Sequence, residues 1–186
     1  MVEVSIDSRQ LAKLTRAVAN IQNGVARVLA PAINRALNSG RTTVRREIRK
    51  VYLIKQKDIP VAVHGASRQR LSGQIVIRDT MLDASKFIYK PRGIQKRKNK
   101  KPLFVQIKKG AGGYVKHAFV AQTGGYTGPF QRTQPERLPI RKLITIGAPI
   151  MASQPNVGPA VNKNMGDTLA KRIDHEIKRV MAKGEK

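Results

Sequence analysis

Residues 31–51 read PAINRALNSGRTTVRREIRKV, and their apolar side chains recur at intervals of three, four or seven. The apolar positions are Ile33, Ala36, Leu37, Val44, Ile48 and Val51. This spacing predicts an amphipathic α-helix, because residues three and four apart share one helix face. Pro31 suits the first turn of such a helix. Gly40 lies in its middle at a cost of about 1 kcal/mol relative to alanine, which predicts a bend or the close approach of another backbone.

Two further helices are predicted near the ends of the chain. Behind Asp7, a good N-cap, apolar residues recur at helical spacing as far as Ile21, and Gly24 ends the segment. In the last part of the chain, apolar residues recur in the same way at Leu169, Ile173, Ile177 and Val180. We therefore predict an N-terminal helix within residues 1–24 and a C-terminal amphipathic helix within residues 153–186.

From about residue 73 the pattern changes to short runs rich in strand-forming residues. The runs cover residues 74–78, 87–89, 103–107, 114–122 and 143–146, and turn signals at 91–93, 110–113 and 124–128 separate them. The five prolines of residues 135–159 predict an irregular, extended strap. Together the patterns predict an α+β fold, with long N-terminal amphipathic helices packed on an antiparallel β-sheet, a core over residues 25–152 and a C-terminal helix.

The balance of charge points to a polyanionic partner. The chain has 37 Lys and Arg against 11 Asp and Glu, a formal net charge of +26. Nucleic acid is the commonest partner of so basic a protein, although a membrane surface or an acidic protein satisfies the same electrostatics. The chain has only four Phe, four Tyr and no Trp, so base stacking is a weaker prediction than contact with phosphates.

One predicted loop, residues 90–102, concentrates this charge. No acidic residue lies between Asp83 and Glu136, and seven basic residues fall within twelve positions: Lys90, Arg92, Lys96, Arg97, Lys98, Lys100 and Lys101. We interpret the loop as a basic hairpin that contacts phosphates, with an affinity that falls as salt rises. A solvated hairpin tip is the alternative; the mutual repulsion of seven like charges favours the first interpretation.

A second basic surface is predicted on the polar face of the helix over residues 31–51. Its residues include Arg41, Arg45 and Arg49, and Glu47 is the one acidic residue in this segment. Any surface helix has a charged outer face, so a solvated surface explains the pattern equally well. In an oligomeric ring, the same face would line a central channel.

The sequence contains no motif of an enzyme or of a cofactor or metal site. There is no cysteine, and His64, His117 and His175 are too scattered for a zinc site of familiar spacing. Asp79 and Asp83 fall in a predicted turn, where aspartate is common. The glycines of residues 108–113 lack the Gly-Lys-Ser or Gly-Lys-Thr of a phosphate-binding loop. We predict a non-enzymatic protein without cofactor or metal. The sequence has no run of about 20 apolar residues, so no membrane span is predicted.

Several fragments, read in order, resemble the prophage minor tail protein Z family. They are Ala32-Ile33-Asn34-Arg35-Ala36-Leu37-Asn38, then Thr42, Thr43, Arg45 and Ile48, then Tyr52-Leu53-Ile54-Lys55 and Asp58-Ile59, and farther on Ala118-Phe119, Arg132-Thr133, Arg137-Leu138-Pro139-Ile140, Leu143, Pro149 and Met151. The resemblance runs from about residue 25 to residue 152. Residues 92–102 and 124–130 depart from the family pattern.

The resemblance implies a structural virion protein that completes the head-proximal end of a phage tail, in the head-tail neck. It implies an oligomeric ring, with a hexamer as one candidate. It also implies neighbours among the tail terminator, tail tube, tape measure and head-tail connector, close to the packaged DNA. Such a protein is synthesised in the host bacterial cytoplasm and resides in the virion. Two alternatives stay open: a tail terminator or other connector subunit, and a basic nucleic-acid-binding protein of another class.

The predicted strap also suggests a subunit interface. Leu138 and Ile140 flank Pro139, which cannot donate a ladder hydrogen bond, so an edge or docking position suits this segment better than a central strand. The predicted interface residues are Arg132, Arg137, Leu138, Pro139 and Ile140. A rigid loop within one subunit is the alternative, and the sequence favours neither.

Overall fold

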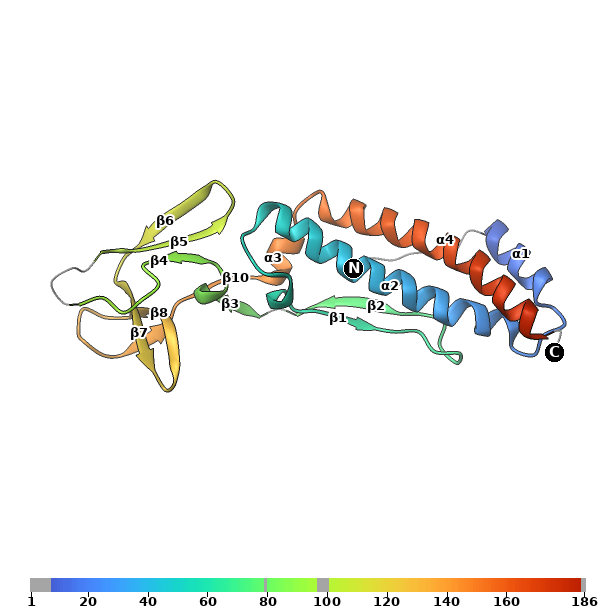
Figure 1. Ribbon diagram of the computed structural model, residues 1–186, viewed down its shortest axis with the longest axis horizontal. Coiled ribbons are helices and arrows are strands. Elements are labelled where there is room, and N and C mark those ends of the chain that lie inside the picture. Colours follow the sequence, from blue (N-terminus) through green and yellow to red (C-terminus); the bar gives the residue numbers. More distant parts are fainter. Residues whose placement is uncertain (1–7, 79, 97–100, 185–186) are drawn as a thin grey trace. The chain divides into compact units, whose positions relative to one another are not determined.

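A computed structural model describes residues 8–78, 80–96 and 101–184 (Figure 1). The chain has an α+β fold, as predicted, and divides into two compact units. Unit 1 consists of Met1–Glu47, Val61–Arg78 and Ala152–Lys186, and unit 2 of Ile48–Pro60 and Asp79–Met151. Each unit is therefore assembled from separate stretches of sequence, and neither coincides with the predicted segments 1–24, 25–152 and 153–186.

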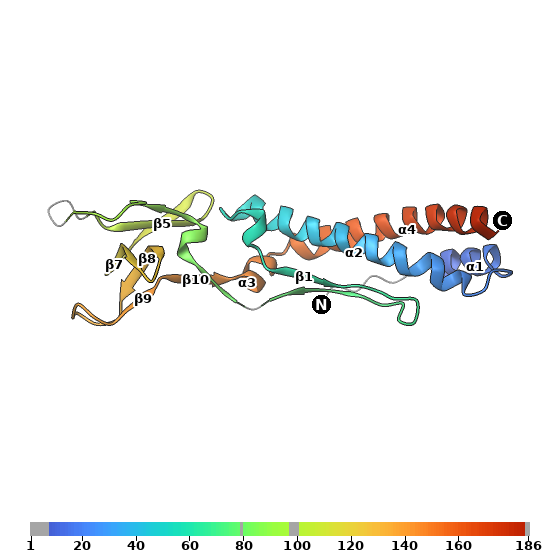
Figure 2. The same ribbon diagram turned by 60° about the horizontal axis from the view of Figure 1, so that its bottom comes forward.

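Unit 1 is built on three helices and one hairpin. The helices are α1 (Ser8–Ala17), α2 (Gly24–Val51, of which residues to Glu47 belong here) and α4 (Val157–Gly184). The hairpin pairs β1 (Val61–His64) with β2 (Gln74–Ile77), antiparallel. Figures 1 and 2 show α4 running alongside α2 and the hairpin following α2.

The core of unit 1 is the apolar face that all three helices share. It consists of Leu14 and Val18 near α1, Val28, Leu29, Ala32 and Ala36 of α2, and Leu169, Ile173, Ile177 and Val180 of α4. Each set recurs at helical spacing, so the apolar periodicity that predicted the helices also marks the faces they bury.

Polar contacts fix the positions of the neighbouring elements around α2. Asn34 accepts a hydrogen bond from the backbone N–H of Ala66 and donates one to its carbonyl, at 2.7 and 2.9 Å. Ser39 donates to the Asn164 side chain at 2.7 Å. At Gly40 a Cβ atom would lie 2.5 Å from Met165 Sδ and 2.8 Å from Ile75 Cδ1. The close approach predicted at Gly40 is therefore made by side chains rather than by another backbone, and α2 continues through it.

Three helix boundaries differ from the prediction. The first helix ends at Ala17 rather than near Ile21, and the chain then turns toward α2 through Asn23, which has a positive φ of 56°. Gly24 begins α2 instead of ending a segment, so Pro31 lies inside the helix and not in its first turn. The last helix begins at Val157, inside the region predicted to be an extended strap.

Unit 2 consists of short antiparallel strands. One sheet pairs β3 (Met81–Asp83) with β10 (Ile144–Gly147). A second has the order β4 (Ile88–Lys90), β5 (Leu103–Lys108), β6 (Ala111–Val115), and a third the order β7 (Ala118–Thr123), β8 (Tyr126–Arg132), β9 (Ile140–Lys142). Two 3₁₀ turns, η1 (Gln56–Asp58) and η2 (Ala84–Lys86), and the short helix α3 (Ala148–Ala152, of which residues to Met151 belong here) complete it.

The core of unit 2 draws on several of these strands. Its buried residues are Ala84, Leu103, Val105, Val120 and Leu143, with Tyr89, Ile107, Val115 and Ala118 packed at its margin. The backbone links the sheets, because Leu143 donates to the carbonyl of Pro129 and accepts from the N–H of Ala84, both at 2.9 Å.

Three strand predictions in unit 2 need correction. The single run 114–122 is two strands, β6 and β7, because the chain reverses at His117, where φ is 59°. The predicted turn 124–128 is limited to Gly124 and Gly125, both with positive φ, and β8 starts at Tyr126. The predicted strap contains β9 and α3, whereas β10 corresponds to the predicted run 143–146.

Candidate nucleic-acid interface

A basic groove of about 640 Å³ lies on unit 2. It is lined by the last turn of α2, the segment through η1, the residues from η2 to β4, and the position after β5. Six lining residues are cationic: Arg49, Lys55, Lys57, Lys86, Arg92 and Lys109. Asp58 is the single acidic residue among the described residues that line it.

The groove forms where backbone hydrogen bonds join the end of α2 to the end of β5. Leu53 donates to the carbonyl of Ile107 at 2.8 Å, and Lys109 donates to the carbonyl of Val51 at 2.9 Å. Between them Tyr52, 2% exposed, pairs with Lys108, whose Nζ lies 5.7 Å from the ring centroid. These contacts bring Lys109 to the same groove as cations some fifty residues earlier in the chain.

The groove has an apolar floor. Tyr52, Ile54 and Phe87 line the groove and are buried, with exposed fractions of 2%, 5% and 4%. The cationic side chains other than that of Lys86 are exposed. Long basic side chains commonly pack their aliphatic stems on apolar surface and keep the charged end in water.

The groove cations are not neutralised by the described part of the protein. None of the six forms a salt bridge with a described carboxylate, whereas Lys13 pairs with Asp174 at 3.7 Å and Arg46 with Glu47 at 3.5 Å in unit 1. Arg49 also lies in the last turn of α2, where a cation interacts favourably with the helix dipole. The helix dipole acts only on the last turn, so it does not stabilise the positive charge of the other five cationic residues of the groove.

The predicted basic loop 90–102 connects two paired strands, β4 and β5, as expected for a hairpin. Arg97, Lys98 and Lys100 lie outside the described residues. Of the others, Arg92 lines the basic groove, while Lys90 ends β4 with its side chain exposed, and Lys96 is also exposed. Lys101 donates its backbone N–H to Gln95 Oε1 at 2.7 Å, which closes the loop at its base.

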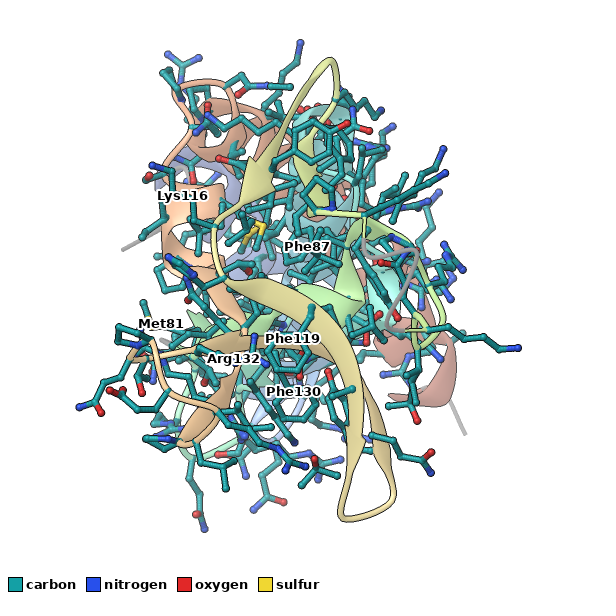
Figure 3. All side chains as sticks on the ribbon, turned by 90° about the vertical axis from the view of Figure 1, so that its left-hand side faces the viewer. Met81, Phe87, Lys116, Phe119, Phe130 and Arg132 are labelled. Carbon is teal, nitrogen blue, oxygen red and sulfur yellow. The ribbon has the colours of Figure 1, made fainter. Side chains whose placement is uncertain are left out.

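A second hollow, of about 330 Å³, contains Lys101 together with Gln95, Phe119 and Arg132. The Arg132 guanidinium lies over the Phe119 ring, 4.5 Å from its centroid, and Figure 3 shows the two side chains together. Stacking of this kind orients a guanidinium without neutralising it. Both basic hollows therefore offer positive charge from positioned side chains.

The arginines predicted on the face of α2 divide between the two units. Arg49 belongs to unit 2 and lines the groove, whereas Arg41 and Arg45 belong to unit 1 and are half-buried. Burial, and then the charge of Arg41, lower the pKa of Arg45 from its usual value. A half-buried arginine is less accessible to an external anion than Arg49.

The residues predicted for a subunit interface lie in and beside the β8–β9 hairpin. Arg132 pairs with Ile140 in the strand register, and Thr133 Oγ1 donates to the carbonyl of Pro139 at 3.3 Å. Leu138 is 65% exposed, and Arg137 and Pro139 are exposed. Among the described strands β9 pairs with β8 alone, which agrees with the predicted edge position. The interface itself stays a prediction.

Sequence reasoning missed four of the six cationic residues of the groove: Lys55, Lys57, Lys86 and Lys109. Lys86 and Lys109 fall in the stretch without acidic residues between Asp83 and Glu136, which was a usable signal. Lys55 and Lys57 lie just beyond α2, and only the contact of this segment with the end of β5 brings them near Lys109.

Asp83, predicted with Asp79 to lie in a turn, has a structural role. It accepts hydrogen bonds at 2.8 Å from the N–H of Ser85 and from the hydroxyl of Tyr126. Asp79 lies outside the described residues. Across those residues, no group of three or more His, Asp or Glu side chains is arranged to hold a metal ion, and none of the helices has the length and apolarity of a membrane span.

Comparison with family models, with curated proteins and with solved structures finds no match to this chain. The resemblance to the minor tail protein Z family therefore rests on the fragments quoted from the sequence.

Proposed function

We propose that this chain is a non-enzymatic structural protein of a phage tail that binds the packaged DNA through the basic groove of unit 2. The observation that carries the DNA-binding part is the groove itself. Six cationic residues and one acidic residue line it, and no salt bridge to a described carboxylate neutralises the six. Binding of a nucleic acid to such a surface is favourable, because each phosphate that is neutralised releases condensed counterions.

Contact with the DNA backbone fits the groove better than the reading of bases. Base recognition needs side chains that reach into a DNA groove or aromatic rings that stack on bases. The groove's Tyr52 and Phe87 are buried and serve as its floor. Exposed lysines and arginines contact phosphates regardless of sequence, which suits a protein that meets whichever DNA end is packaged.

The location in the tail is supported by the ordered fragments that resemble the minor tail protein Z family. We infer from them a tail-completion role at the head-proximal end, in a homo-oligomeric ring with the hexamer as candidate. The tail terminator, tail tube, tape measure and head-tail connector would be its neighbours. A tail terminator or another connector subunit is the nearest alternative.

A basic nucleic-acid-binding protein outside the virion is the second candidate function, and the same groove favours it. The two differ in where the protein resides. Particles assembled without the chain should have incomplete or poorly infective tails if it is a tail component. Normal infectivity without it would leave only the second candidate.

The groove is tested by the salt dependence of DNA binding. Replacement of Lys55, Lys57 and Lys109 by glutamine should reduce the slope of log Kobs against log salt by about two to three units, since each phosphate contact on duplex DNA contributes about 0.9. Equilibrium binding of the full chain to duplex DNA at several salt concentrations measures the slope.

The matched control removes three exposed lysines of α4 in unit 1. Lys163, Lys171 and Lys178 are replaced by glutamine, so the net charge falls by the same amount. We expect this control to keep the original slope. An equal fall of slope in both variants would mean that net charge, and not the groove, binds DNA.

A further inference from the structure

The second hollow of unit 2 combines positive charge with apolar walls. It has a volume of about 330 Å³ and is lined by Lys101 and Arg132, with no acidic residue among its described lining residues. Leu103 and Val120, 1% and 7% exposed, supply apolar surface. The volume is near the lower end of the range for small-ligand sites. The hollow therefore suits one small molecule or group that has both an anionic and an apolar part.

Arg132 presents a planar cation that is held in place. Its guanidinium carbon lies 4.5 Å from the centroid of the Phe119 ring, and Figure 3 shows the two side chains side by side. Phe130 lies opposite Phe119 in the strand register and two residues before Arg132, so all three side chains project from one face of the sheet. The N–H of Arg132 also donates to the carbonyl of His117 at 3.1 Å, which fixes its backbone beside the start of β7.

The hollow lies at an open edge of that sheet. Strand β7 is the first strand in the order β7, β8, β9, so within the described residues no strand pairs with its outer edge. Side chains from both faces of β7 line the hollow, Phe119 from one face and Val120 from the other. A flat ligand that enters beside this edge therefore meets both the Arg132–Phe119 pair and apolar surface.

The hollow adjoins the basic groove. Pro91 lines the hollow, and Arg92, the next residue, lines the groove. Successive Cα atoms are about 3.8 Å apart, so the two surfaces meet at this point. Arg92 and Lys101 are both exposed, and the hydrogen bond from the Lys101 N–H to Gln95 keeps Lys101 at the base of the loop. A phosphate backbone bound in the groove can therefore continue past Arg92 to Lys101.

A nucleotide matches this combination better than an aliphatic carboxylate does. Its base is a flat ring, and guanidinium planes and aromatic rings are the surfaces on which unpaired bases stack. Its phosphate is the anion that suits the adjoining basic groove. The bases of a duplex stack on one another, so a nucleotide without a pairing partner enters a pocket at the least cost.

We propose that the second hollow of unit 2 binds an unpaired nucleotide at the end of a DNA molecule whose duplex lies in the basic groove. The base stacks on the Arg132–Phe119 pair, and its phosphate contacts Lys101. Such stacking accepts any base, because every base has a flat face. This inference rests on the DNA-binding part of the proposed function, and it adds that the chain binds DNA ends with an unpaired nucleotide more tightly than blunt ends.

Three DNA probes test the site on the full chain. The first is a blunt duplex, the second has one unpaired nucleotide added at an end, and the third has an abasic nucleotide in the same place. The last two carry the same phosphates and differ only in the base. We expect the unpaired nucleotide to bind about tenfold more tightly than the abasic one, a value within the range of base stacking in single-strand-binding proteins. Fluorescence anisotropy measures the three affinities.

Two substitutions remove the stacking surface while they preserve its charge or its apolar character. Arg132→Lys keeps the positive charge without the planar guanidinium, and Phe119→Leu keeps an apolar side chain without the ring. Each should reduce the preference for the unpaired base to about twofold or less. The preference is a ratio of two affinities of one variant, so a general change in DNA binding cancels. Binding of the blunt duplex shows that unit 2 of the variant is folded.

Matched controls make the same changes elsewhere in unit 2. Arg141→Lys alters an exposed arginine of β9, and Phe104→Leu alters a phenylalanine of β5, and neither residue lines the hollow or the groove. Both controls should keep the full preference. Loss of the preference in the controls as well would overturn the assignment to the hollow.

Equal affinities of the unchanged chain for the unpaired and abasic probes would overturn the inference and leave the DNA binding of the groove in place. A preference that survives both R132K and F119L would also overturn it, because the base would then stack elsewhere. Failure to bind the blunt duplex would instead contradict the proposed function, on which the inference rests.

Discussion

The hydroxyl of Tyr126 lies 2.8 Å from both carboxylate oxygens of Asp83, and this contact joins the start of β8 to the start of η2. Burial, and then the neighbouring carboxylate, raise the pKa of Tyr126 above its usual value near 10, although a hydrogen bond with Ser85 opposes the shift. Ionisation of the Tyr126 hydroxyl is therefore expected to lower the free energy of unfolding at alkaline pH.

Tyr126→Phe should lower the free energy of unfolding by about 1–3 kcal/mol, because it leaves a half-buried carboxylate without its hydroxyl donor. A raised folded-state pKa stabilises the fold below the unfolded pKa, and this contribution is lost as pH rises through the folded pKa. The unchanged chain should therefore lose stability above about pH 10 that Y126F does not lose.

Urea unfolding between pH 8 and 11 measures both effects. Tyr114→Phe is the control, since this tyrosine is 71% exposed. Equal pH profiles of the unchanged chain and Y126F would contradict the role given to the hydroxyl.

At the scale of elements, the contact of α2 with α4 and β2 depends on a missing side chain. A Cβ atom at Gly40 would lie within 3 Å of both Met165 and Ile75. Gly40→Leu should therefore destabilise the protein by about 1–3 kcal/mol through overpacking, and Met165→Ala in the same chain should recover part of the loss.

Gly166 in α4 gives the opposite prediction. A Cβ atom there meets nothing within 4 Å, so Gly166→Ala should raise the free energy of unfolding by about 1 kcal/mol through helix propensity alone. Thermal and urea unfolding of both variants measure the contrast. A Gly40 variant as stable as the unchanged chain would show that α4 does not pack closely on α2 at this point.

The helices were predictable from sequence because their periodicity extends over many turns. The ends of the helices were harder to predict. The sequence placed Pro31 in the first turn of a helix, whereas α2 begins at Gly24 and contains Pro31 in its interior. Strand β8 was missed because Gly128 and Pro129 weaken its pattern. Residues 135–159 were misread as a strap because three of their prolines are compatible with regular structure. Pro139 precedes β9, and Pro149 and Pro159 lie in the first turns of α3 and α4, where no backbone donor is needed.

The candidate site could be predicted only in part, for a similar reason. The concentration of positive charge in residues 90–102 and the choice of Arg49 and Arg92 as candidate contacts follow from local sequence. The groove, however, requires Lys109 to meet Lys55 and Lys57, and that depends on the hydrogen bonds between residues 51–53 and 107–109. No local pattern encodes such a contact.

At the scale of the whole molecule, the excess of positive over negative charge is larger in unit 2. Its stretches contain 19 Lys and Arg and four Asp and Glu, against 18 and seven in unit 1, and the basic groove and the smaller basic hollow both belong to unit 2. Unit 1 has the longer helices, and the buried Glu47 and Glu176 lie beside Arg46 and Arg179. We infer a division of labour, in which unit 2 meets the anionic partner.

The most direct measurement of this claim is a crosslink formed inside assembled particles. A photoreactive amino acid replaces Lys57 in the groove in one variant and Lys171 of α4 in another, and both positions are exposed. The account predicts that irradiation of purified virions attaches packaged DNA to the chain from position 57 and not from position 171. Virions that contain the chain but yield no DNA crosslink from position 57 would contradict it.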